Sequence, residues 1–235
     1  MCRDKRASWL FFFAAWVALT LGSGCATTPG YGYGPLEGTP TSEGWKRVDH
    51  PIYPVTFEVP KDTMVTTIGW LVPGSPRRKD GLDEPLPIYS YVHEDRQLPL
   101  YALDIGIYVI TTDYKGVDDA SLEALSDGSM STKMLRGFVR DVFFDGKDDA
   151  PIGVQTKTNI SGYPAWQVHA DNMALTEKDR RPLSDAEIFL VPLDGHSCLL
   201  IAGVFSYDAK PRLRREVFPR IMGSMKIEKR SPFVR

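Results

Sequence analysis

This sequence of 235 residues has few cysteines and no long hydrophobic run. Two of its 3 cysteines, Cys2 and Cys25, lie within the first 25 residues, so Cys198 is alone in the remainder. That remainder therefore cannot form an internal disulfide. The apolar run 9–19 falls well short of the roughly 20 residues that a membrane-spanning helix needs.

The sequence also lacks an excess of positive charge and the common motifs of cofactor sites. Its 28 basic and 30 acidic residues leave a net charge of −2, whereas a nucleic-acid-binding domain is expected to be basic. No glycine-rich phosphate loop occurs, and no two histidines have the spacing of a metal site. We therefore expect no nucleic-acid partner, no cofactor and no metal. The histidines considered are His50, His93, His169 and His196.

The first 24 residues have the features of a signal peptide. Basic residues near the N-terminus are followed by the uncharged stretch 7–21, as in a secretory signal. The small residues at 22–24 then precede Cys25, and this segment resembles the bacterial lipobox, whose cysteine is acylated and becomes the new N-terminus. The resemblance implies a lipoprotein signal over residues 1–24 and acyl chains such as palmitate on Cys25. We expect this lipid anchor to attach the chain to a membrane.

Two other interpretations of the N-terminus stay open. Gly22 occupies the position where the lipobox usually has leucine, and Gly24 and Ala26 satisfy an ordinary small-x-small cleavage site. An uncleaved anchor is the third interpretation, and the short apolar run argues against it. In lipoproteins an aspartate after the cysteine often causes retention at the inner membrane, and here that residue is Ala26. We therefore expect a cell-envelope protein, with the outer membrane favoured, that faces the periplasm.

Composition divides the remaining chain into a spacer, a domain and a tail. Residues 25–44 comprise the lipidated cysteine and a linker rich in Gly, Pro and Thr, which has too few apolar residues to fold alone. Residues 45–228 are long enough for one domain with its own core. Residues 229–235 form a basic tail.

Hydrophobic periodicity predicts an α+β domain. Alternating apolar residues indicate strands, as at Val55, Phe57 and Val59, and the strand through 105 and 107 is expected to be half-buried. An apolar stripe over 134–143 indicates the central helix; a short helix capped by Asp118 or Asp119 precedes it. A last helix opens at Pro211 and must kink or split at Pro219. The expected strands cover 55–59, 64–72, 88–93, 98–111, 152–160, 163–170, 187–193, 197–207 and 225–227. This order favours an antiparallel β-sheet with helices packed on its faces.

Several landmarks resemble the PsbP-like superfamily, including its DcrB-like lipoproteins. They are the opening VTFEVP at 55–60, the ISGYPAW at 160–166, and a terminal helix with Phe218 and Ile221 followed by SMKI at 224–227. The resemblance implies an antiparallel sheet with helices on its faces and a role in binding or assembly. It transfers no functional residues. Independently of the family, Gly162 suits a tight turn that needs positive φ, and Trp166 is expected in the core.

Three clusters are candidates for chemistry. His169 and Asp171 alternate on a strand and should face the same side, which suits a metal or an acid–base pair, or else a solvated strand end. Ser197 and Cys198 lie in a segment that resembles a nucleophile elbow without its second glycine; Cys198 is more simply a small buried hydrophobe. An acidic cluster after the central helix is either a solvated turn or a weak cation site. Its members are Asp145, Asp148 and Asp149.

The C-terminal segment is basic. It either contacts anionic lipid headgroups or forms the solvated face of the last helix. The basic residues are Lys210, Arg212, Arg214, Arg215, Arg220, Lys229, Arg230 and Arg235.

The sequence as a whole favours a membrane-anchored envelope lipoprotein. We expect a non-catalytic binding or assembly module whose partner is an envelope protein or a small ligand. One alternative is an envelope hydrolase that uses Ser197, His169 and Asp171. The other is a structural protein that contacts lipid headgroups or the cell wall.

Overall fold

The chain divides into two compact units, Met1–Gly32 and Tyr33–Arg235, and the residues described below all belong to the second. The computed structural model describes residues 36–49, 55–66, 76, 79, 88–92, 103–144, 146–147, 150–173, 184–205 and 211–228. The expected signal peptide, Cys25 and the basic tail lie outside these residues. Within them, no helix is both long and apolar enough to cross a membrane.

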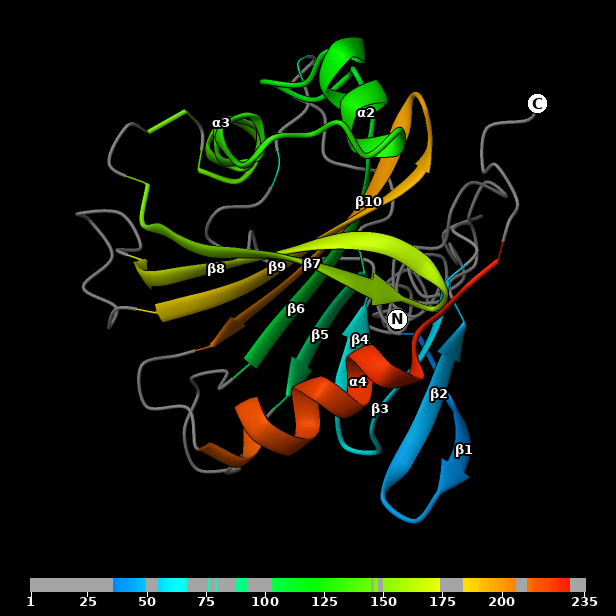
Figure 1. Cartoon of the computed structure of the whole chain (residues 1–235). Coiled ribbons are helices and arrows are strands. Elements are labelled where there is room, and N and C mark those ends of the chain that lie inside the picture. The colour runs from blue at the N-terminus through cyan, green and yellow to red at the C-terminus, as the bar shows by residue number, and fades with distance from the viewer. Residues whose placement is uncertain are drawn as a thin grey trace, which may run out of the picture. The chain divides into compact units, whose positions relative to one another are not determined.

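The strands form two antiparallel sheets (Figure 1), which confirms the α+β class while adding a sheet to the single one expected. The smaller sheet has the order β1-β2-β3-β11, with bounds Thr39–Ser42, Trp45–Asp49, Val55–Pro60 and Lys226–Ile227. The larger sheet has the order β4-β5-β6-β10-β9-β8-β7. Its strands are β4 Met64–Thr66, β5 Ile88–Val92, β6 Leu103–Ile110, β7 Ile152–Ile160, β8 Tyr163–Met173, β9 Ser184–Asp194 and β10 Ser197–Phe205.

Helix α2 begins where the sequence predicts it, and α3 begins two residues before its predicted apolar stripe. Helix α2 (Asp119–Ser126) has Asp118 as its N-cap, whose carboxylate accepts a hydrogen bond from the Ser121 amide at 2.9 Å. Helix α3 (Thr132–Phe143) follows the N-cap Ser131. Such caps satisfy amides that have no partner within the helix. Met134, expected on the apolar stripe of α3, is instead 45% exposed because it lies in the first turn, beyond the edge of the core.

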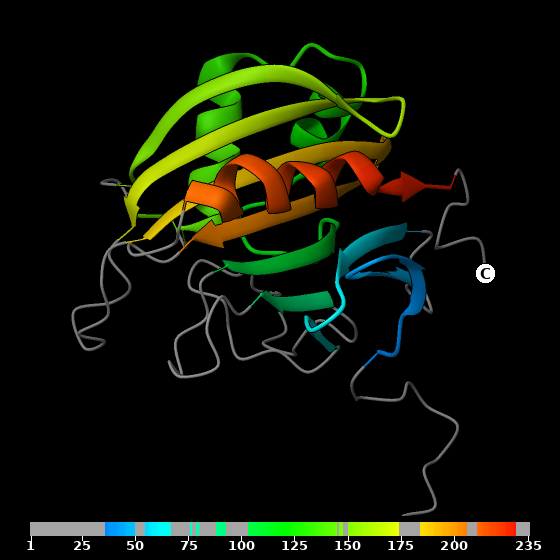
Figure 2. The same ribbon diagram turned by 90° about the horizontal axis from the view of Figure 1, so that it is seen from below.

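The larger sheet separates two apolar cores. Helices α2 and α3 pack on one face, and the C-terminal helix and the smaller sheet pack on the other (Figures 1 and 2). Strand β6 lies inside the larger sheet, and both of its faces are covered. Residues 105–110 are therefore all buried, so the expected half-buried strand was wrong. The alternating apolar residues at 103–109 all point to one face of β6, so the pattern did not reveal that the other face is covered as well.

The C-terminal helix adapts to Pro219 by widening. A π-helical turn, η1 (Leu213–Val217), leads into α4 (Phe218–Ser224). Proline has no amide hydrogen and crowds the preceding turn, and here the Phe218 amide donates to the Leu213 carbonyl, five residues back. The predicted break at Pro219 is thus confirmed as a π-bulge.

The tight turn between β7 and β8 is formed by Ser161 and Gly162. Ser161 and Gly162 both have positive φ (54° and 85°), as a two-residue hairpin requires. The Ser161 hydroxyl accepts a hydrogen bond from the Ile227 amide at 3.1 Å, which links this hairpin to β11. Trp166 is partly buried against the core beneath α2 and α3, as expected.

Part of the expected linker belongs to the domain. The Leu36 amide donates to the Val65 carbonyl at 2.8 Å, and residues 39–42 form β1, which pairs with β2. The polar composition of 36–44 hid this strand, because β1 is exposed along its whole length. It is held by backbone pairing and by Arg220 of α4, which donates to the Ser42 hydroxyl at 2.9 Å.

Candidate functional site: a polar face on β8 and β9

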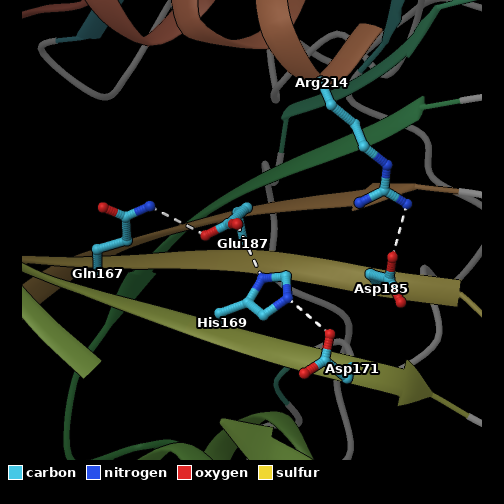
Figure 3. A network of polar contacts seen from close by, with 6 residues as sticks. All are labelled: Gln167, His169, Asp171, Asp185, Glu187 and Arg214. Carbon is cyan, nitrogen blue, oxygen red and sulfur yellow. Dashed lines mark hydrogen bonds and ion pairs between the residues drawn. The ribbon is translucent and has the colours of Figure 1, made fainter. Parts of the chain in front are cut away.

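The sheet face that carries the C-terminal helix changes from apolar to polar along β8 and β9. Ala165 and Phe189 belong to the core beneath that helix. Side chains alternate between the two faces of a strand, so every second residue from these two positions shares their side. We define the polar face as those residues and the arginine of η1 that reaches them (Figure 3). It consists of Gln167, His169, Asp171, Asp185, Glu187 and Arg214.

His169 lies at the centre of the polar face, between two carboxylates. Its Nδ1 is 2.8 Å from Glu187 Oε1, and its Nε2 is 2.7 Å from Asp171 Oδ1. Glu187 is the residue directly opposite His169 in the register of β8 and β9, whereas Asp171 lies two residues further along β8. The side chains of His169, Glu187 and Asp171 are 30%, 23% and 59% exposed, so solvent reaches this site.

The other polar residues hold the acidic side chains of β9 in place. Gln167 Nε2 donates to Glu187 Oε2 at 3.0 Å, so both oxygens of Glu187 are engaged. Arg214 lies 2.7 Å from Asp185, and its guanidinium stacks over the Phe205 ring at 4.5 Å. A guanidinium held by a carboxylate and an aromatic face is well fixed. Asp171 is therefore the least constrained acid of the polar face.

The surroundings of His169 favour its charged form. Burial on its own would lower the pKa of His169, but the attraction of Glu187 and the hydrogen bond and charge of Asp171 outweigh it and raise this pKa above its ordinary value. Opposite charges within a few ångströms favour the protonated ring. The ring therefore carries more positive charge near neutral pH than an isolated histidine would.

Gly153 on β7 leaves room for this pair. A Cβ at this position would lie 3.3 Å from the His169 carbonyl oxygen and 3.5 Å from Asp171 Oδ2. A Cβ there would crowd the His169 carbonyl and would come into ordinary contact with Asp171 and the ring. The backbone of Asp171 is also held next to the start of β7, because its amide donates to the Pro151 carbonyl at 3.1 Å.

The arrangement is poorly suited to a metal or to proton abstraction. The two carboxylates occupy opposite nitrogens of the ring and do not converge on one point, and the part of the chain that the structure describes holds no group of three or more potential metal ligands with suitable geometry. A general base also needs a free nitrogen within reach of a substrate. What these residues offer is charge and hydrogen-bonding capacity.

The predicted pair of Ser197 and His169 does not form. Ser197 lies opposite Asp194 and His169 opposite Glu187, and these two partners are seven residues apart on β9, or roughly 23 Å at the usual rise per residue. Ser197 is buried, and its hydroxyl donates to Asp194 Oδ1 at 2.8 Å. The hydrolase alternative built on Ser197, His169 and Asp171 is therefore wrong in its geometry, although His169 and Asp171 do meet as predicted.

Cys198 is a buried residue of the core beneath α2 and α3, as the simpler interpretation of the sequence predicted. Burial, with a smaller contribution from the charge of Asp194, strongly raises the pKa of its thiol. A thiol kept protonated and covered is a poor nucleophile.

The remaining candidate residues add no further cluster to the described part of the chain. His196 lies at the β9–β10 turn, 3.5 Å from Asp119, and both side chains are well exposed. His50 and His93 lie outside the described residues. The same holds for the acidic cluster Asp145, Asp148 and Asp149.

Three arginines of the C-terminal helix have acidic partners within the domain. Arg212 lies 3.6 Å from Glu216, Arg214 is bound to Asp185, and Arg220 lies 3.7 Å from Glu58. These internal partners compete with lipid headgroups for the same charges. Lys210, Lys229, Arg230 and Arg235 lie outside the described residues.

Sequence reasoning missed Glu187, Gln167, Asp185 and Arg214 as members of this site. His169 and Asp171 could be paired because their spacing on one strand fixes their side. Glu187 is 18 positions from His169 and comes opposite it only through the register of β8 and β9. Polar residues at every second position, 167–171 and 185–187, were the available signal.

Comparison with known proteins gives similarity of structure alone. No protein-family model matches the chain, and no curated protein matches it. Its structure is similar to the solution structure of the cyanobacterial PsbP (CyanoP) of Synechocystis sp. PCC 6803, with a TM-score of 0.49 and 11% identity over 82% of this chain and 97% of that one. It is also similar to LpqN, involved in cell envelope biogenesis of Mycobacterium tuberculosis, with a TM-score of 0.38 and 14% identity over 85% and 99%.

Proposed function

We propose that this chain is a lipid-anchored module of the bacterial cell envelope that binds a protein partner through its polar face and catalyses no reaction. Cys25 carries the acyl chains, and Ala26 after it favours the outer membrane. The domain presents the polar face to a basic segment of the partner.

The charge of the polar face is the observation that carries this proposal. Asp171, Asp185 and Glu187 outnumber Arg214 and the protonated His169. Asp171 is also 59% exposed. Surfaces that bind each other carry complementary charges, so a lysine or arginine of the partner fits beside Asp171.

The contacts of the candidate nucleophiles support a non-catalytic role. Ser197 donates its hydrogen bond to Asp194, and Cys198 is buried with a raised pKa. Both ring nitrogens of His169 already face carboxylates. Ser197, Cys198 and the protonated His169 are thus each engaged within the domain.

Site-specific crosslinking in the native envelope tests the proposal. A photoreactive amino acid replaces Thr156, an exposed residue of β7 directly opposite Gln167 and so on the same side of the sheet. We expect one discrete protein adduct from this position. The matched control replaces Lys133, an exposed residue of α3 on the opposite side of the sheet, and should give no such adduct.

Charge reversal shows whether the adduct depends on the polar face. Asp171→Lys should abolish the Thr156 adduct, whereas Asp62→Lys, an exposed aspartate in the turn after β3, should leave it intact. Equal adducts from positions 156 and 133, or an adduct that survives Asp171→Lys, would contradict the proposal. A small ligand as the true occupant would leave position 156 without protein adducts, which would also contradict it.

A further inference from the structure

The two contacts of His169 require two ring protons. A neutral imidazole has one N–H donor and one lone pair, and only the imidazolium donates from both nitrogens. In the structure both nitrogens lie within 2.8 Å of a carboxylate oxygen. With a neutral ring, one of these contacts would set a lone pair against a negative oxygen. The geometry is therefore that of a protonated His169.

We propose that His169 is a proton-operated clasp between β8 and β9: protonated, it holds Glu187 and Asp171 together, and on losing its proton it releases Asp171. This clasp needs no binding partner, so its test stands apart from that of the proposed function.

Of the two contacts of His169, the one with Asp171 is lost on deprotonation. Glu187 is held by a second hydrogen bond, from Gln167 Nε2 at 3.0 Å, and is only 23% exposed. Asp171 is 59% exposed, and its neighbour Gly153 on β7 has no side chain to hold it. A neutral ring therefore donates its single N–H to Glu187, and the Asp171 carboxylate forms hydrogen bonds with water instead.

The clasp lies near the end of the regular pairing between β8 and β9, so its opening affects that end. The pairing of β8 with β9 is regular from Trp166 to Ala170, and a register shift follows before Met173. His169 and Glu187 thus form one of the last regular cross-strand pairs. Cross-strand pairs of opposite charge stabilise a sheet, so losing this one weakens the ladder where it is already interrupted.

The charges around His169 fix the sign of the pH dependence. The charged groups of the polar face are Asp171 on β8, Glu187 and Asp185 on β9, and Arg214 on η1, which is bound to Asp185; the described residues opposite them on β7 and β10, Gly153 and Gly203, carry none. The acids raise the pKa of His169 in the closed state. The clasp is therefore fully closed below the ordinary histidine pKa of about 6.5 and opens as the pH rises through the raised pKa.

Histidine NMR titration and amide hydrogen exchange on the full chain test the clasp together. We expect His169 to titrate above 6.5, and Asp171→Asn to lower its pKa while Asp62→Asn leaves it unchanged. The opening constants of the amides at 168–170 and 186–188, corrected for intrinsic exchange, should rise as the pH passes from below 6.5 to above the raised pKa of His169. The total rise should be tenfold for each unit by which this pKa exceeds 6.5.

The variant His169→Gln supplies the control for exchange. Its opening constants at the same amides should not change over this pH range, and His196→Gln, at the exposed turn histidine, should behave as the wild type. The clasp is refuted if His169 titrates at or below 6.5. Opening constants that stay flat with pH in the wild type would refute it as well.

Discussion

At the scale of single residues, Gly203 determines how closely the C-terminal helix approaches the sheet. A Cβ at this position of β10 would lie 2.5 Å from Cε2 and 2.6 Å from Cζ of the Phe218 ring. Phe218 also contacts Phe205 edge-on, with 5.3 Å between ring centroids. The missing side chain thus lets the Phe218 ring approach the backbone of β10 closely, at the residue that pairs with Glu187.

Gly203→Ala should therefore destabilise the domain by overpacking. We expect a loss of about 1–3 kcal/mol in the free energy of unfolding, because neither β10 nor α4 can move without disturbing the core. Urea denaturation measures this loss. Gly195→Ala is the matched control, since a Cβ there has no atom within 4 Å. A Gly203→Ala protein as stable as the control would contradict the packing described.

The same scale shows why only two of the six residues of the polar face, His169 and Asp171, were predicted as a pair. His169 and Asp171 were paired correctly because their positions on one strand are fixed by local geometry. Glu187 was missed because its approach depends on the register across a connection of ten residues, 174–183, that leaves no periodic signal. Local spacing specifies which side a residue faces, and the register specifies its neighbours.

At the scale of elements, Arg220 joins the first hairpin of the domain to its last helix. Its guanidinium lies 3.9 Å from the centroid of the Trp45 ring in β2 and donates to the Ser42 hydroxyl in β1. Residues 42 and 220 are far apart in the sequence, so this contact closes the smaller sheet against α4. Few other side chains of β1 and β2 are buried, Val48 being the exception.

Arg220→Ala should loosen this hairpin. We expect a loss of about 0.5–1 kcal/mol from the cation–π contact, together with faster amide exchange in residues 39–49 than in β9 or β10. Arg212→Ala is the control, because its ion pair with Glu216 is more than 70% exposed on both sides and such pairs contribute little. Uniform exchange rates across both sheets in Arg220→Ala would show that the hairpin does not depend on this residue.

Most elements were predictable from local pattern, and their assembly was not. The strands predicted over 55–59, 152–160 and 163–170 are present within β3, β7 and β8. The N-cap of α2 and the break at Pro219 also follow from backbone chemistry. The division into two sheets was missed because β11 pairs with β3 from the other end of the chain. Strand β1 was missed because its composition is that of a linker.

At the scale of the whole molecule, the layers explain where a partner has access. Helices α2 and α3 cover one face of the larger sheet, and the C-terminal helix covers only part of the other. The polar face lies on this second face, where Asp171 is 59% exposed. The domain therefore presents a charged surface, and the proposed anchor at Cys25 precedes it in the chain.

Fractionation of cells that produce the Cys25→Ser protein tests the anchored module most directly. Because acyl chains on Cys25 supply the membrane affinity, we predict that the wild type is found with the membranes and Cys25→Ser in the soluble fraction. Cys2→Ser, which removes the other N-terminal cysteine, should remain with the membranes. If the Cys25→Ser protein stayed membrane-bound, the chain would not be a lipoprotein anchored at this residue.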